Sequence, residues 1–241
     1  GGYKHVFRII AGDNQIGSSM ATYAAKIMKA KTAAVVDDRT AFGQGVAAEF
    51  IKEAKAQGLT IVGQEYTTDK ATDFSAILTS IKAKKPDVMF YGGYAPQAAP
   101  MARQMKQLAV GTKMLGGDTL CSPEMGKLGG DAVNDMVFCA QGGSMLDKTN
   151  DGPTFKAKFK KRFNLDADAY AASFYVQMLL IGQSMVKAGS TDPEKVAAEM
   201  RKGSYKGVVG TYAYDDKGNM KQAPVTVYNF KNAVAVPLAS Y

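Results

Sequence analysis

The chain has 241 residues, of which 46% are hydrophobic and 22% are charged, a composition typical of a folded protein with one large domain or two small ones. No apolar stretch reaches the roughly 18 residues that a membrane-spanning helix needs, so no transmembrane segment is predicted. The formal net charge is +8, but the lysines are scattered along the chain and indicate a solvated surface, so no nucleic-acid partner is predicted.

The first half of the chain alternates between strand-like and helix-like patterns. The leading residues YKHVFRII indicate a strand, and residues 1–31 are interpreted as the remnant of a first lobe followed by a crossover helix. Beyond them, apolar runs recur about every 25 residues, at 32–37, 59–65, 87–92, 112–117 and 136–140. Strands separated by helices at this spacing predict right-handed βαβ units and a parallel sheet. Residues 32–140 are therefore interpreted as a complete, doubly wound α/β lobe.

The second half does not continue this spacing. Residues 141–206 predict three helices, at 152–163, 168–188 and 192–202, and the last begins at TDPEK with a capping residue followed by proline. Residues 207–241 are interpreted as a hairpin that returns to the second lobe, with the strands GTYAYDDKGN and APVTVYNF joined by a turn at 216–219.

The predicted tail lacks a layer on which to pack. Three helices with apolar faces and one isolated strand cannot bury those faces by themselves. We therefore expect that the first part of the protein is missing, because the chain is a fragment or because another molecule supplies the layer. One consequence would be self-association of the chain through Phe159, Phe174 and Met178.

Three chemically distinctive side chains follow predicted strands of the lobe. Phe42 lies in DDRTAFGQG, Tyr94 in GGYAPQ and Asp118 in GGDTLCSP. Singly, each has an ordinary structural interpretation, as a packing residue or a helix cap. The carboxyl ends of parallel strands meet at one edge of a sheet, where ligands bind. Together the residues therefore predict a site for a small zwitterion, with the acid binding an ammonium group and the rings covering an apolar side chain or attracting the cation.

The sequence contains no recognisable catalytic motif. It lacks the G-x-G-x-x-G, GK[ST] and G-x-S-x-G patterns, and its one histidine, His5, lies on the isolated strand away from any nucleophile. We therefore predict no enzyme, no metal and no cofactor. Cys121 and Cys139 are not in a CxxC pair, and the alternatives for them are one disulfide or two buried thiols.

Several segments resemble a known family. AAVVDDRTAFGQG, the DFS helix start, YGGY and GTYAYDDKGNMK are similar to the periplasmic leucine/isoleucine/valine-binding proteins, over nearly all of the 241 residues. These proteins are the substrate-binding subunits of branched-chain amino acid ABC transporters. The resemblance implies the type I periplasmic-binding-protein fold, hinge closure of two lobes on an amino acid, a periplasmic location and an ABC permease as partner. Family members are longer at the front, so it also implies a truncated chain with an incomplete site.

The resemblance assigns individual residues as well. Tyr94 corresponds to the pocket tyrosine of the second lobe, and Asp118 stands where the family has an acid that binds the α-ammonium. Phe42 stands where many members have tyrosine. Tyr170 matches an aromatic residue that lines the pocket from the first lobe. The family has the longer glutamate at the position of Asp118, and aspartate would draw the ammonium inward or admit a water.

Two further expectations follow from the resemblance. An oxidising periplasm would permit a disulfide between Cys121 and Cys139. The alternative function is that of a ligand-sensing or regulatory protein of the same fold that binds amides, urea or aromatic acids.

Overall fold

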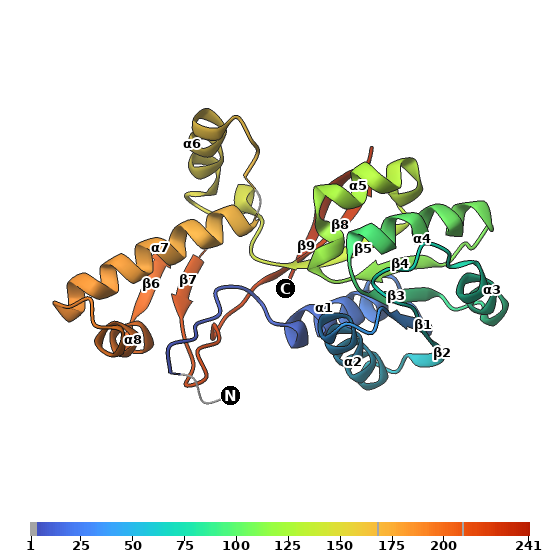
Figure 1. Cartoon of the computed structure of the whole chain (residues 1–241), viewed down its shortest axis with the longest axis horizontal. Helices are drawn as coiled ribbons and strands as arrows, with labels where there is room; N and C mark the ends of the chain where they lie inside the picture. Colours follow the sequence, from blue (N-terminus) through green and yellow to red (C-terminus); the bar gives the residue numbers. More distant parts are fainter. Residues whose placement is uncertain (1–3, 168, 209) are drawn as a thin grey trace. The chain divides into compact units, whose positions relative to one another are not determined.

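The computed structural model describes residues 4–167, 169–208 and 210–241, and its chain divides into two compact units (Figure 1). Each unit is built from separate segments of the chain. Unit 1 comprises the described residues of 1–12, 142–225 and 240, and unit 2 comprises 13–141, 226–239 and 241. The chain therefore passes between the units close to residues 12, 141 and 225.

Unit 2 is built on a sheet of seven strands in the order β2-β1-β3-β4-β5-β8-β9. The strands are β1 Thr32–Asp37, β2 Thr60–Tyr66, β3 Val88–Gly92, β4 Lys113–Gly116, β5 Val137–Gly142, β8 Val225–Lys231 and β9 Val234–Ser240. The pairs among the first five strands are all parallel. This order confirms a doubly wound, mostly parallel sheet, and β8 and β9 from the end of the chain extend it beyond the five strands predicted within residues 32–140.

Helices cover both faces of this sheet. They are α1 Asp13–Lys26, α2 Ala41–Ala56, α3 Ser75–Lys84, α4 Ala95–Gln107 and α5 Pro123–Gly129. The helix α1 packs against α2, whereas α4 packs against α3 and α5, and Figure 1 shows the two groups on opposite faces. Because both faces are covered, every residue of β3 is buried. On one face Phe50 of α2 stacks on Phe90 of β3, with ring centroids 4.3 Å apart.

Unit 1 holds the three predicted tail helices and a short hairpin. They are α6 Gly152–Phe163, α7 Ala169–Ala188, α8 Pro193–Lys202, β6 Ser204–Gly207 and β7 Gly210–Ala213. The helix α7 packs against α8, and its buried residues join Tyr205 and Tyr212 of the hairpin in one core. The predicted cap is present, because the side chain of Asp192 accepts hydrogen bonds from the first backbone amides of α8.

The helix α7 is apolar on two sides. One side, including Ala172, Val176 and Leu180, is buried in the core of unit 1. The other side is exposed and carries Phe174, Tyr175, Met178, Leu179 and Val186. A helix that is apolar all round is normally buried all round. Unit 1 therefore presents a large apolar face that the described residues of the unit do not cover.

Two expectations for the chain ends are wrong. Residues 4–10 form no strand, although they belong to unit 1 and are followed by α1 in unit 2. The expected pairing of the last two strands is also not formed. A turn is present at 215–219, but β7 pairs with β6 and β8 joins the large sheet. The cause is that β8 is buried along almost its whole length, as a central strand is.

The basic residues are less evenly scattered than expected. Five of the 12 residues of α6 are basic, in the sequence GPTFKAKFKKRF. Lys156 and Lys160 pair with Asp147 and Asp166, respectively. A local concentration of positive charge therefore lies on unit 1.

Candidate ligand-binding site

The candidate site lies at the carboxyl edge of the sheet in unit 2. Strands β1, β3 and β4 are neighbours there, and the register pairs Asp37 with Gly92 and Tyr91 with Gly116. Because the strands are parallel, the loops that follow them leave the sheet at the same edge. These loops carry Phe42, Tyr94 and Asp118, and the structure brings them together.

The two predicted aromatic side chains are in contact. Phe42 is half-buried in the first turn of α2, and the centroids of the Phe42 and Tyr94 rings are 5.3 Å apart with 45° between the ring planes. Tyr94 is 38% exposed because it occupies the extended residue just before α4, where the chain leaves β3. This position explains why a ring is exposed at a strand-to-helix turn.

Asp118 begins the 3-10 turn η1, which spans Asp118–Cys121, and its side chain is half-buried. Its Oδ1 accepts a hydrogen bond from the backbone N–H of Thr119 at 3.0 Å. The Thr119 hydroxyl donates to the carbonyl of Gly93 at 2.6 Å, which joins the Asp118 loop to the Tyr94 loop. A Cβ added to Gly117 would lie 3.5 Å from Cζ of Phe42, so the residue before the acid also faces the ring.

Asp38 organises the loop that carries Phe42, and the sequence analysis did not identify it. Its Oδ1 accepts from the backbone N–H of Thr40 at 2.9 Å and from the Thr40 hydroxyl at 2.6 Å. The Thr40 oxygen in turn accepts from the N–H of Gly43 at 2.9 Å and caps α2. The spacing of aspartate, threonine and glycine in DDRTAFG is the signal that could have revealed this arrangement.

The interior beside this loop contains two polar atoms with no hydrogen bond among the described residues. They are Oδ2 of Asp38, whose residue is 2% exposed, and the hydroxyl of Tyr91, which is fully buried. Burial raises the pKa of Tyr91, and the negative charge of Asp38 raises it further. Tyr91 therefore stays neutral at physiological pH.

Tyr170 lies in the other unit, in the first turn of α7, where its side chain is half-buried. Its predicted role as an aromatic residue that lines the pocket from the first lobe stays a prediction. One unit thus contains three of the predicted site residues, Phe42, Tyr94 and Asp118. Together these three residues are called the rim.

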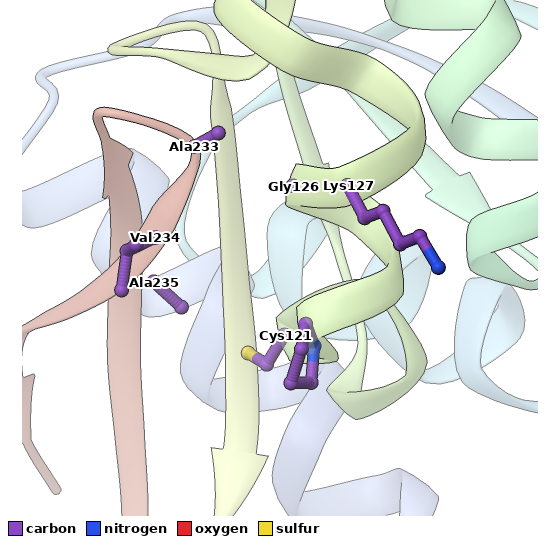
Figure 2. A pocket seen from close by; sticks show the side chains of 7 residues that line it. Cys121, Gly126, Lys127, Ala233, Val234 and Ala235 are labelled. Carbon is purple, nitrogen blue, oxygen red and sulfur yellow. The ribbon is translucent and has the colours of Figure 1, made fainter.

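Cys121 and Cys139 are joined in a disulfide, with Cα atoms 5.5 Å apart. Cys121 also lines a groove of about 420 Å³ between α5 and the turn that connects β8 with β9. Figure 2 shows the Cys121 sulfur directed toward the strands, whereas Lys127 extends away from them. The groove is narrow at Gly126, because a Cβ there would overlap the carbonyl of Ala233.

The chemistry of the rim favours an organic cation with an apolar part. Its charged side chain is a carboxylate that can accept hydrogen bonds from an ammonium group. The Phe42 and Tyr94 rings can cover apolar carbon atoms or attract the cation through their faces. Among the described residues, no group of three or more histidine, cysteine, aspartate or glutamate side chains could hold a metal ion. In that same part of the chain, no helix combines the length and apolar character needed to cross a membrane.

The sequence is similar to those of amino-acid-binding proteins. It is 30% identical over 232 residues to a leucine-, isoleucine-, valine-, threonine- and alanine-binding protein of Pseudomonas aeruginosa, and the match covers 95% of this chain and 61% of that protein. It is 31% identical over 232 residues to the Leu/Ile/Val-binding protein BraC3 of Rhizobium johnstonii, with coverages of 95% and 62%. The chain thus spans less than two thirds of the length of these relatives.

Solved structures share the fold. A leucine-binding protein, LivK, of Thermotoga maritima is 26% identical and superposes with a TM-score of 0.91 over 99% of this chain and 68% of its own. The substrate-binding protein LivJ of Streptococcus pneumoniae, solved with isoleucine, is 20% identical and has a TM-score of 0.86 over 98% of this chain and 69% of its own. These likenesses confirm the type I periplasmic-binding-protein fold. A sequence model described as "Periplasmic binding protein" matches residues 1–234, and the chain therefore belongs to the periplasmic binding protein family.

Proposed function

We propose that this chain supplies one wall of a binding site for a branched-chain amino acid, in a solute-binding protein of an ABC importer. The observation that carries the proposal is the contact between Phe42 and Tyr94 beside the loop of Asp118. The names of the relatives support the ligand class, because those proteins are described as binding leucine, isoleucine and valine.

Each rim residue has a role in this proposal. Asp118 accepts hydrogen bonds from the α-ammonium group, and the two rings pack on the aliphatic side chain. Tyr170 remains a further ligand-binding residue in the proposal, on the basis of the family resemblance alone. The amino acid's carboxylate needs donors that are not among these four residues. The rim by itself therefore distinguishes ligands by their ammonium group and apolar bulk.

The site of this chain is incomplete in our proposal. The exposed apolar side of α7 and the length relative to the relatives both support a second wall from residues outside the 241. Closure of two lobes around the ligand would then bury it. Without that wall the polar partners of the ligand carboxylate are lacking, and we expect binding in the millimolar range at best.

The wider assignment follows from the family. We propose a periplasmic location, an ABC permease as the partner and a binding role without catalysis or cofactor. The family's description as periplasmic binding proteins supports this proposal. A ligand-sensing role on the same fold would use the same rim and differ in the molecule bound.

The proposal can be tested by titrating the ¹⁵N-labelled chain with leucine and following amide shifts by NMR. We expect saturable shifts at residues 93, 94 and 118, and a dissociation constant raised roughly tenfold in Asp118→Asn, the effect of losing one hydrogen bond to a charged group. The matched control is Asp131→Asn, which removes the same charge from an exposed residue paired with Lys106.

The choice of ligand separates the alternatives. The 2-hydroxy analogue of leucine keeps the apolar chain and carboxylate but lacks the ammonium, and it should bind the wild-type chain no better than leucine binds Asp118→Asn. Tighter binding of acetamide or benzoate than of leucine would favour the sensing alternative. Equal affinity of leucine for wild type and Asp118→Asn would refute the assignment of this rim.

A further inference from the structure

The turn that carries Asp118 ends at a covalent bond. The 3-10 turn η1 consists of four residues, with Asp118 first and Cys121 last. A 3-10 helix rises about 2 Å per residue, so the acid and the cysteine lie within one turn of each other, roughly 6 Å apart along its axis. Any constraint on Cys121 therefore acts directly on the segment that positions the acid.

The disulfide attaches this turn to the sheet. Its other half, Cys139, is fully buried in β5 and is the register partner of Gly116, the last residue of β4. The chain thus leaves β4, forms η1 and is bonded back to the neighbouring strand beside the point where it left. The covalent loop itself comprises residues 121–139, and Asp118 lies three residues before it, in a segment held by β4 at one end and by the disulfide at the other.

The remaining attachments of the turn are weaker. Leu120 is fully buried, the Thr119 hydroxyl donates to the carbonyl of Gly93, and the backbone N–H of Thr119 donates to Oδ1 of Asp118. A single neutral hydrogen bond contributes only about 1 kcal/mol. These contacts would keep the turn near the sheet without the disulfide, but the last residue of the turn would no longer be bonded to β5.

We propose that the Cys121–Cys139 disulfide is a positioning bond for Asp118, and that its oxidation state controls how well the rim binds an ammonium group. The proposal rests on the function assigned to the rim above. The cysteines act through Asp118 and do not contact the ligand themselves. The bond therefore couples the redox state of the surroundings to ligand affinity.

The groove gives a thiol reagent access to the disulfide. Cys121 is 7% exposed and lines the groove (Figure 2), whereas Cys139 is fully buried, so we expect an external thiol to attack the sulfur of Cys121. A thiolate of a small dithiol attacks Sγ of Cys121, the bond between the two cysteines breaks, and Cys139 leaves as the thiolate. The second thiol of the reagent then closes its own disulfide and releases Cys121. The dithiol is oxidised by two electrons and the protein is reduced by two.

The test is a thermodynamic cycle between the disulfide and the acid. Leucine dissociation constants are measured by NMR for wild type, Cys121→Ala/Cys139→Ala, Asp118→Asn and the triple variant. We expect loss of the disulfide to weaken leucine binding by roughly fivefold when Asp118 is present, and by less than about twofold in the Asp118→Asn background. Wild type reduced with dithiothreitol, with both thiols confirmed by mass spectrometry, should have the same leucine dissociation constant as the double-alanine variant. Agreement between the two excludes an effect of the alanine substitutions themselves.

Controls and outcomes separate this inference from the proposed function. Leu78→Ala, in the same core cluster but on α3, should lower stability without changing leucine affinity. An equal loss of affinity in both backgrounds, or no loss in either, would overturn the positioning role while leaving the rim assignment intact. If Asp118→Asn binds leucine as well as wild type does, the rim assignment fails and the positioning role fails with it.

Discussion

The hydrogen bond between Thr119 and Gly93 joins two loops of the rim, and its removal by Thr119→Val gives a sharp test. Valine keeps the shape of threonine but has no hydroxyl, so the buried carbonyl of Gly93 loses the donor that is 2.6 Å away. Leaving a buried acceptor unsatisfied costs about 1–3 kcal/mol. Thr119 is half-buried, so water can replace part of the bond, and we expect about 1–1.5 kcal/mol.

Native-state hydrogen exchange is the suitable assay, because it reports on unit 2 separately from unit 1. The slowest amides of β1 and β3 should exchange roughly tenfold faster in Thr119→Val at the expected loss of stability. Thr119→Ser keeps the hydroxyl and should exchange these amides almost as slowly as wild type. Equal exchange rates in the valine and serine variants would show that the bond does not stabilise the unit.

Three further changes test other parts of the structure. Gly43→Ala should destabilise unit 2 by about 1–3 kcal/mol in urea unfolding, because its Cβ would overlap Oδ1 of Asp38, whereas Gly111→Ala, with open space around it, should be neutral. Hydrogen bonds from two backbone amides lower the pKa of Asp87. The ionised carboxylate therefore stabilises the fold above pH 3.8, and this stabilisation is lost as the pH falls below that value. The difference in unfolding free energy between wild type and Asp87→Asn should accordingly shrink between about pH 7 and pH 3. Met178→Ser should reduce self-association of the chain in sedimentation velocity, because this residue is 69% exposed on α7; a monomeric wild type would contradict that.

The clustering of the rim residues was predictable because it depends on topology. Parallel strands place their carboxyl ends together, so the loops with Phe42, Tyr94 and Asp118 had to leave the same edge once the strands were identified. Contacts within the cluster were not predictable. The 5.3 Å ring contact and the Thr119–Gly93 hydrogen bond depend on loop conformations that residue spacing does not determine.

Asp38 shows a second limit of sequence reasoning. It follows β1 directly and could have been interpreted as a rim acid like Asp118. In the structure it is 2% exposed and holds Thr40 through its Oδ1. Both aspartates follow strands at the same edge, but Asp38 is buried and Asp118 is half-buried, and residue spacing does not determine this difference.

The errors at the ends of the chain have one physical origin: apolar pattern indicates how deeply a segment is buried but not what buries it. The run VTVYNFK was assigned to a hairpin, yet its almost continuous burial is that of β8 between β5 and β9. The same reasoning applies to α7, whose sequence is apolar on two sides while the described part of unit 1 covers only one. The apolar residues of β8 are buried in the structure, as its sequence pattern predicts. If the same holds for α7 in the working protein, its exposed apolar side must contact a partner. Identifying that partner would show what completes the core of unit 1.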